Sequence, residues 1–249
     1  MTNISVQYEP PLPAKETLPT MYDLPSENPE EPGLPDQFHY FQPQLLDQTF
    51  QPPNKNPDRL FCGSDMNLYY DVKHPNWYKR PDWFAVVGVP RLYEEQDMRL
   101  SYVVWQEGVN PLVAVELLSP GTEDEDLGET LGEPRKPPTK WEVYESILRV
   151  PYYVTFSRYT NQIQAFHLVG DRYQRAELSN GRLLLPSIQL SLGLWQGTYS
   201  KIDRLWLRWM TLEGNLISTP EEEAAVATQR ADRLAAKLRE LGIDPDELS

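Results

Sequence analysis

The sequence predicts an α/β fold in which a mixed β-sheet carries a packed helix, and a separate amphipathic helix follows. Three observations lead to this class. Short β-rich segments follow one another from Leu60 onward, a helical pattern interrupts them at residues 139–150, and a continuous helical pattern covers residues 221–242. With 249 residues and 40% apolar content, the chain can bury one sizeable core. We therefore expect one globular domain with appendages.

Proline dominates the start of the chain. Of the 24 prolines, 12 lie before residue 60, in stretches such as EPPLPAKETLP, where a continuous helix or strand is implausible. We expect residues 1–59 to form a proline-rich N-terminal arm, extended over about 1–35, with a short helix from about Phe38 to Phe50. His39 in this helix is expected to pack or to cap rather than to bind a ligand.

Residues 60–217 are expected to form the globular domain. Its β-rich segments are bounded by turn residues, and Thr160-Asn161 and Asn180-Gly181 mark the later segments as antiparallel hairpins. The expected strands cover residues 60–72, 83–90, 100–105, 111–119, 151–157, 162–169 and 172–179. A mixed sheet with the helix of residues 139–150 packed on it is the favoured architecture.

Glu116 lies within the apolar run PLVAVELLS. Because side chains alternate along a strand, this run is apolar on both faces, which is typical of a central strand covered on both sides. An unpaired buried carboxylate costs several kcal/mol, so it is neutralised, paired or bound to a metal. The alternative is a glutamate at the strand end that reaches solvent or an arginine.

Asp82 stands at the start of another apolar strand, directly after Pro81. Two strands could therefore each present one carboxylate at the same edge of the sheet. A Pro-Asp pair is also an ordinary turn signal.

Lys140 occupies an unfavourable position in its helix. Thr139 and Glu142 form a capping box, which makes Lys140 the first helical residue, where a cation opposes the helix dipole by roughly 0.3–1 kcal/mol. Lys140, Tyr144 and Ile147 share one face, which a packed helix turns inward. A lysine on that face would meet the two carboxylates, unless its long side chain reaches solvent.

Two carboxylates and an inward lysine suit metal-dependent cleavage of phosphodiesters. Carboxylates hold Mg²⁺ or Mn²⁺, the metal lowers the pKa of a bound water, and the lysine stabilises developing charge. Asp82 and Glu116 are the expected metal ligands, and Asp82, Glu116 and Lys140 are the expected catalytic residues.

Here the sequence resembles the bacterial putative restriction endonuclease family of the PD-(D/E)XK nuclease superfamily. The segments RPDWFAVVGVP, VAVELLSPGTEDEDLG, KWEVYESILRVPYYVTF and RLAAKLRELGIDPDEL carry the resemblance. It implies a restriction-endonuclease-like mixed sheet flanked by helices, endonuclease activity on DNA, and Asp82 and Glu116 as ligands of a divalent metal.

The chain departs from the family pattern in several places. The usual superfamily lysine would lie two residues after Glu116, where this chain has Leu118. The resemblance implies that the lysine lies on the following helix instead, and Lys140 matches that position by its spacing to Tyr144. Lys136 is a rival for this role. The family's early acidic ligand is unassigned, with Asp47 as a guess. Ser119 corresponds to the serine of the family pattern, and it either hydrogen-bonds a ligand carboxylate or forms a turn.

Charge and composition restrict the partners. The net charge of −14 opposes non-specific binding to phosphate backbones, so binding to DNA must depend on a local site or on a divalent metal. The sequence has a single cysteine, Cys62, starts without a basic and apolar leader pattern, and contains no apolar run approaching 18 residues. We expect a soluble, cytoplasmic protein without a membrane segment.

Residues 218–249 are expected to form a C-terminal helix with a heptad pattern. Six residues alternate spacings of three and four and form the seam: Ala224, Ala227, Ala231, Leu234, Leu238 and Leu241. This seam either packs on the domain or frays, or it contacts a second chain in a homodimer. The alternative to the nuclease is accordingly an inactive nuclease-fold scaffold that dimerises or recruits partners through this helix.

Overall fold

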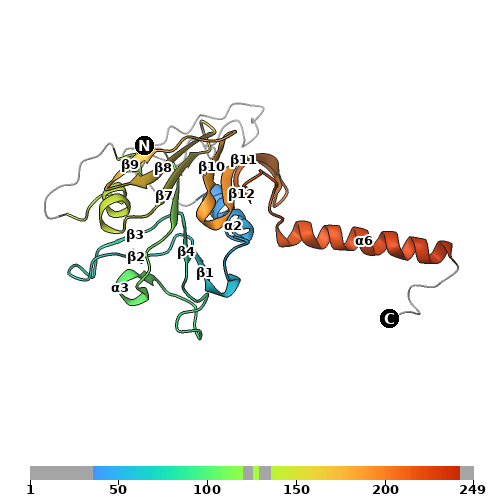
Figure 1. Ribbon diagram of the computed structural model, residues 1–249, viewed down its shortest axis with the longest axis horizontal. Coiled ribbons are helices and arrows are strands. Elements are labelled where there is room, and N and C mark those ends of the chain that lie inside the picture. The colour runs from blue at the N-terminus through green and yellow to red at the C-terminus, as the bar shows by residue number, and fades with distance from the viewer. Residues whose placement is uncertain (1–35, 120–125, 129–135, 242–249) are drawn as a thin grey trace, which may run out of the picture. The chain divides into compact units, whose positions relative to one another are not determined.

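The computed structural model describes residues 36–119, 126–128 and 136–241 (Figure 1). The extended arm expected over residues 1–35 lies outside these ranges, as does much of the connection that precedes residue 136. Within them the chain divides into two compact units. Residues up to Pro43 and Asp58–Glu177 form the first unit, and Gln44–Pro57 with the residues from Leu178 onward form the second.

The first unit is built on a six-stranded mixed sheet, which confirms the predicted α/β class (Figure 1). Strands β6 and β7 pair in parallel, and the other neighbours in this sheet pair antiparallel. In spatial order the strands are β1 (Leu60–Gly63), β4 (Trp83–Val87), β6 (Val113–Leu117), β7 (Tyr152–Ser157), β8 (Gln162–Val169) and β9 (Arg172–Arg175). A parallel pair requires a crossover connection, and the one between β6 and β7 contains the helix α5 (Lys140–Glu142) and the π-helical turn η2 (Val143–Ile147).

Strand β6 lies between β4 and β7, and each of its five residues is buried. This confirms the interpretation of its apolar run as a central strand covered on both faces. The crossover helix packs over the sheet through Val143, Tyr144 and Leu148, which join Ala114 of β6 and Tyr153 of β7 in one hydrophobic cluster. The side of β6 that carries Ala114 is also the side that carries Glu116.

A second, three-stranded sheet belongs to the same unit. It consists of β3 (Tyr78–Lys79), β2 (Leu68–Tyr69) and β5 (Tyr102–Val103), in that order. The strand predicted over 60–72 is thus two strands in different sheets. The strand predicted over 100–105 ends at Val103, because the chain turns there into the short helix α3 (Val104–Glu107), closed by Gly108 at φ 70°.

The helix expected from Phe38 to Phe50 is α2, and it runs from Gln37 to Thr49. The Asp36 carboxylate accepts a hydrogen bond from the backbone N–H of His39 at 2.8 Å and so caps the helix. The 3₁₀ turn η1 (Pro57–Arg59) leads from the following loop into β1.

The second unit contains a three-stranded antiparallel sheet that the sequence did not predict. Its strands are β10 (Arg182–Leu185), β11 (Leu190–Tyr199) and β12 (Ile202–Thr211), with the 3₁₀ turn η3 (Pro186–Ile188) between the first two. Asn180-Gly181 was predicted to join two strands of a hairpin. Instead it closes one isolated bridge between Ser179 and Arg182, because β9 and β10 lie in different sheets.

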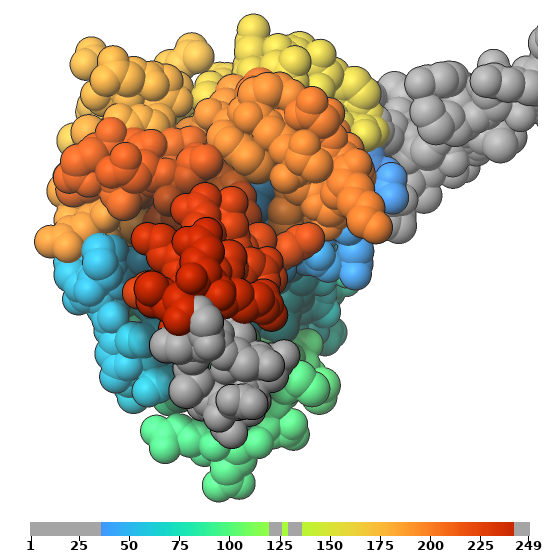
Figure 2. All heavy atoms as spheres, turned by 90° about the vertical axis from the view of Figure 1, so that its right-hand side faces the viewer, coloured from blue at the N-terminus to red at the C-terminus, as the bar shows by residue number. Residues whose placement is uncertain are grey.

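Helix α6 (Pro220–Glu240) follows β12. Thr219 and Glu222 form a capping box at its start, and the buried Arg208 of β12 pairs with the Glu222 carboxylate. None of the residues of α6 is buried; in Figure 2 the helix, in red, is seen nearly end-on. Its first turn is therefore anchored, and its length is exposed.

Candidate active site

Asp82 and Glu116 meet because of the register between β4 and β6. Trp83 pairs with Val115 in this antiparallel ladder, so the residue before β4 lies beside Glu116. The backbone N–H of Asp82 approaches the Glu116 carboxylate at 3.4 Å, and the N–H of Leu117 donates to the Asp82 carboxylate at 2.6 Å. The two carboxylates expected at one edge of the sheet are thus neighbours.

Lys140 reaches this pair from the start of α5. Its ammonium nitrogen Nζ lies 2.9 Å from Glu116 Oε2 and 3.0 Å from Asp126 Oδ1. The predicted capping box is present and fixes the start of the helix: the Thr139 hydroxyl accepts from the N–H of Glu142, whose carboxylate accepts from the N–H of Thr139. The rival lysine, Lys136, is exposed.

The π-helical turn places Tyr144 but not Ile147 on the inward face. The Tyr144 hydroxyl donates to Glu116 Oε1 at 2.8 Å, so each oxygen of this buried carboxylate has a partner. Ile147 is 42% exposed, so its predicted inward position is wrong. The reason is the wider π-helical turn, in which the N–H of Leu148 donates to the carbonyl oxygen of Val143, five residues earlier. Residues that would share a face of a regular α-helix therefore no longer do so.

Asp126 is a further acid at this site, buried and not singled out by the sequence analysis. Its carboxylate contacts Lys140, and its backbone carbonyl accepts from the Tyr153 hydroxyl at 2.7 Å. The available signal was the acidic run EDED after the Glu-x-x-Ser-Pro segment, which reads equally well as a solvated loop. Asp47, the guess for the early acidic ligand, is exposed and belongs to the second unit.

His39 ties the start of α2 to the end of β6. Its Nε2 lies 3.2 Å from the Leu117 carbonyl oxygen and 3.3 Å from the Ser119 hydroxyl, and its Nδ1 lies 2.8 Å from Asp36. Asp36 also pairs with Arg158 at 2.8 Å. His39 therefore packs as expected, and its place next to the carboxylate pair is what sequence reasoning missed.

Burial controls the protonation of the two carboxylates. Glu116 has no exposed surface, and this burial raises its pKa to about 7, although the Lys140 charge opposes the shift and the Asp82 charge adds to it. Burial likewise raises the pKa of Asp82, against the opposing charges of Lys140 and His39. Each carboxylate is therefore harder to ionise than in water.

The pKa values of the two nearby cations, Lys140 and His39, are raised as well, which favours their charged forms. Burial alone would lower the pKa of Lys140, but the charges of Glu116, Asp126 and Asp82 outweigh it and raise that pKa well above its usual value. Burial would also lower the pKa of His39, yet the hydrogen bond to Asp36 and the charges of Asp82 and Asp36 raise it to about 9. Lys140 and His39 are thus both charged at neutral pH.

These shifts predict that the metal-free protein loses stability as the pH rises from about 5 to 9. Because its pKa is raised, Glu116 does not lower the free energy of unfolding below about pH 4.5. Above about pH 7 it lowers that free energy in full, by on the order of 1–3 kcal/mol. The raised pKa of His39 gives stability that is complete below about pH 6.5 and lost through about 9. Both groups therefore lower the free energy of unfolding as the pH rises.

Urea unfolding at pH 5, 7 and 9 measures this dependence. Glu116→Gln should flatten the profile between pH 5 and 7 without changing it between 7 and 9, and His39→Gln should do the reverse. If the free energy of unfolding of the wild type instead rises from pH 5 to 7, burial does not raise the pKa of Glu116 in this way.

The donor set fits an ion held by few protein ligands. Mg²⁺ is commonly bound through one or two carboxylates with water completing the octahedron, and Asp82 and Glu116 supply two such groups from adjacent strands. A divalent cation would also offset the burial that raises both pKa values, because its positive charge favours the ionised carboxylates. Among the described residues, no group of three or more His, Cys, Asp or Glu side chains could hold a metal by itself. Water ligands would have to complete the shell.

The chain matches a known protein family. The Uma2 family, described as putative restriction endonuclease, matches residues 12–200 of the chain. No curated protein matches it. None of the helices within the described ranges is both long enough and apolar enough to cross a membrane.

Proposed function

Because the chain belongs to the Uma2 family of putative restriction endonucleases, we propose that it is a divalent-metal-dependent endonuclease that hydrolyses DNA phosphodiester bonds. The observation that carries this proposal is the convergence of Asp82, Glu116 and Lys140 from two strands and the crossover helix. The PD-(D/E)XK superfamily, to which the family belongs, has the restriction-endonuclease-like fold that the resemblance implied. Its nucleases typically require a divalent metal.

In the proposed site, Asp82 and Glu116 would hold Mg²⁺ or Mn²⁺. When bound, the metal supplies a water of lowered pKa and positive charge for the phosphoryl oxygens. Asp82 is only partly buried, whereas Glu116 is completely buried, so the ion and the phosphate would approach from the Asp82 side. Tyr144 holds Glu116 Oε1 and keeps the carboxylate in one orientation.

Lys140 has the position of an electrostatic catalyst in this proposal. Its side chain is 20% exposed while both carboxylates that it contacts are almost fully buried, so its positive charge is held against two buried acids. The raised pKa keeps it charged throughout the working range. A fixed positive charge there stabilises the negative charge that develops on the phosphoryl oxygens.

The DNA substrate has to overcome a net protein charge of −14. A metal bound between the two carboxylates would replace local repulsion with attraction at the point of cleavage. A cytoplasmic location accompanies this proposal, because the substrate is there and a single cysteine suits a reducing compartment.

A second candidate is the inactive scaffold. It is favoured by one observation: Lys140 and Tyr144 already satisfy both oxygens of Glu116, as they would in a buried polar network that only stabilises the fold. On this alternative the network needs no metal, and the protein acts through its C-terminal helix.

A cleavage assay separates the two. Incubated with supercoiled plasmid, the wild type should nick or linearise DNA when Mg²⁺ or Mn²⁺ is present, and a chelator should stop the reaction. Asp82→Ala/Glu116→Ala protein, purified in parallel, controls for contaminating nuclease and should be inactive. If the wild type cleaves no DNA with any divalent metal, the scaffold is the correct reading.

A further inference from the structure

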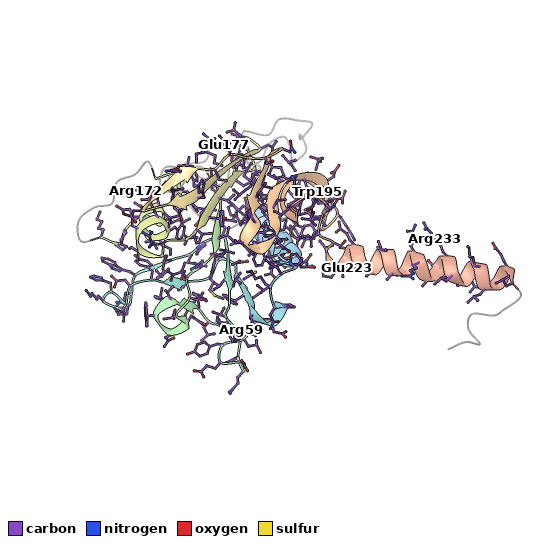
Figure 3. All side chains as sticks on the ribbon, in the orientation of Figure 1. Arg59, Arg172, Glu177, Trp195, Glu223 and Arg233 are labelled. Atoms are coloured by element: carbon purple, nitrogen blue, oxygen red, sulfur yellow. The ribbon has the colours of Figure 1, made fainter. Side chains whose placement is uncertain are left out.

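Helix α6 has an exposed length that its own unit does not cover. Of its 21 residues none is buried, and its anchoring contacts, the capping box and the Arg208 pair, lie in its first turn. In proteins most of the stability of a helix comes from packing its amphipathic face rather than from helix propensity. Figure 3 shows Glu223 and Arg233 along this helix, with side chains projecting from the ribbon.

The apolar seam runs along this exposed helix. Leu234 is 55% exposed and Leu241, just after the helix, is 74% exposed. A shallow hollow follows the same line and is lined in part by Ala227, Ala231 and Leu234, with Glu223 and Arg230 beside them. An amphipathic helix with such a stripe normally packs it against another surface.

From side-chain size and charge along the seam, we propose that a second copy of this chain covers it as an antiparallel helix pair. The seam is small at its start and large at its end: three alanines precede three leucines. A parallel pair would place alanine against alanine and leave the first half poorly packed. In the antiparallel pair Ala224 faces Leu234 of the second copy, Ala227 faces Ala231, and Leu238 faces Pro220, so two leucines of each copy lie against the start of the other helix.

Charge selects the same orientation. The first turn of α6 carries Glu221, Glu222 and Glu223, and the last turn carries Lys237 and Arg239. Antiparallel packing places each acidic end beside the basic end of the other copy and opposes the two helix dipoles. At the flank of the seam, Glu223 then lies opposite Lys237 of the second copy. A parallel pair instead aligns acid with acid.

The antiparallel register has one unfavourable contact. The two-fold axis crosses the middle of the helix and brings Arg230 opposite Arg230 of the second copy, where like charges repel. This contact gives the proposal a distinctive signature. Arg230→Gln should strengthen an antiparallel dimer, whereas in a parallel pair Arg230 faces Ala235 and the change should have no effect.

Disulfide trapping in the full chain tests the orientation. In a Cys62→Ser background, Ala224→Cys/Leu234→Cys should form a covalent dimer on mild oxidation, because the two positions face each other. Ala224→Cys alone should remain monomeric on a denaturing gel, since its two copies lie about 15 Å apart and a disulfide needs Cα atoms within about 7 Å.

Light scattering supplies the second readout. The wild type should show a monomer–dimer equilibrium, and Arg230→Gln should shift the average mass toward the dimer at the same concentration. Efficient trapping by Ala224→Cys alone would establish a parallel pair and overturn the proposal. A monomeric mass for both proteins, together with no trapping by the double variant, would overturn it as well.

Discussion

Lys140→Met is expected to slow DNA cleavage by about 10²-fold or more while leaving metal affinity close to that of the wild type. The ammonium contacts Glu116 and Asp126, and in the proposed reaction it stabilises charge on the phosphate. Without metal the variant should also be less stable, by up to about 3–5 kcal/mol, because two buried carboxylates lose their common cation. Proton uptake by these acids at lower pH should recover part of that loss.

Two further variants separate catalysis from stability. Lys140→Met/Asp126→Asn removes one of the stranded charges, so it should regain stability and remain slow. Lys136→Met changes an exposed lysine four residues away and should match the wild type in both rate and stability. If the double variant regained its cleavage rate along with its stability, Lys140 would be a structural residue rather than a catalytic one.

Asp82→Asn and Glu116→Gln should each reduce cleavage by about 10²–10³-fold or more, because each replaces a proposed metal ligand by a neutral amide of the same shape. Glu116→Gln should at the same time stabilise the metal-free protein at pH 8. The reason is that the ionised form of this buried carboxyl group lowers the stability of the wild type above about pH 7. A protein that becomes more stable and less active cannot owe its inactivity to unfolding.

The matched control is Asp126→Asn, which leaves Asp82, Glu116 and the contact between Lys140 and Glu116 in place. Its rate should fall much less than that of either ligand variant. If Asp126→Asn were as inactive as Glu116→Gln, Asp126 would belong among the metal ligands and the assignment would have to change. Initial cleavage rates at saturating Mn²⁺, with unfolding curves for each variant, make the comparison.

The parts of the site that the sequence predicted are those that local pattern determines. The run around Glu116 is apolar on both faces, which requires a central strand, and β6 has that place. Thr139 and Glu142 determine the first turn of α5 and hence the position of Lys140. Pro81 fixes where β4 begins, so Asp82 lies at the strand start. Each of these features depends on a few neighbouring residues.

The parts that it missed depend on contacts between distant segments or on unusual backbone. Asp126 is buried because Lys140 and Tyr153 approach it, and an acidic run alone gives no sign of that. The β11–β12 hairpin turns at Ser200 and Lys201, both at positive φ, where Asn-Gly would have been the recognisable signal. Ile147 faces outward because of a π-helical turn, which regular helical spacing does not anticipate.

Calorimetric titration of Mg²⁺ and Mn²⁺ at pH 8 tests the central claim most directly. The wild type should bind about one ion per chain through the two carboxylates, and Asp82→Ala/Glu116→Ala should show no binding heat above dilution. Retained folding of the variant, checked by circular dichroism, makes that loss specific. Equal binding by wild type and variant, or no binding by the wild type at millimolar metal, would contradict the assignment of Asp82 and Glu116 as metal ligands.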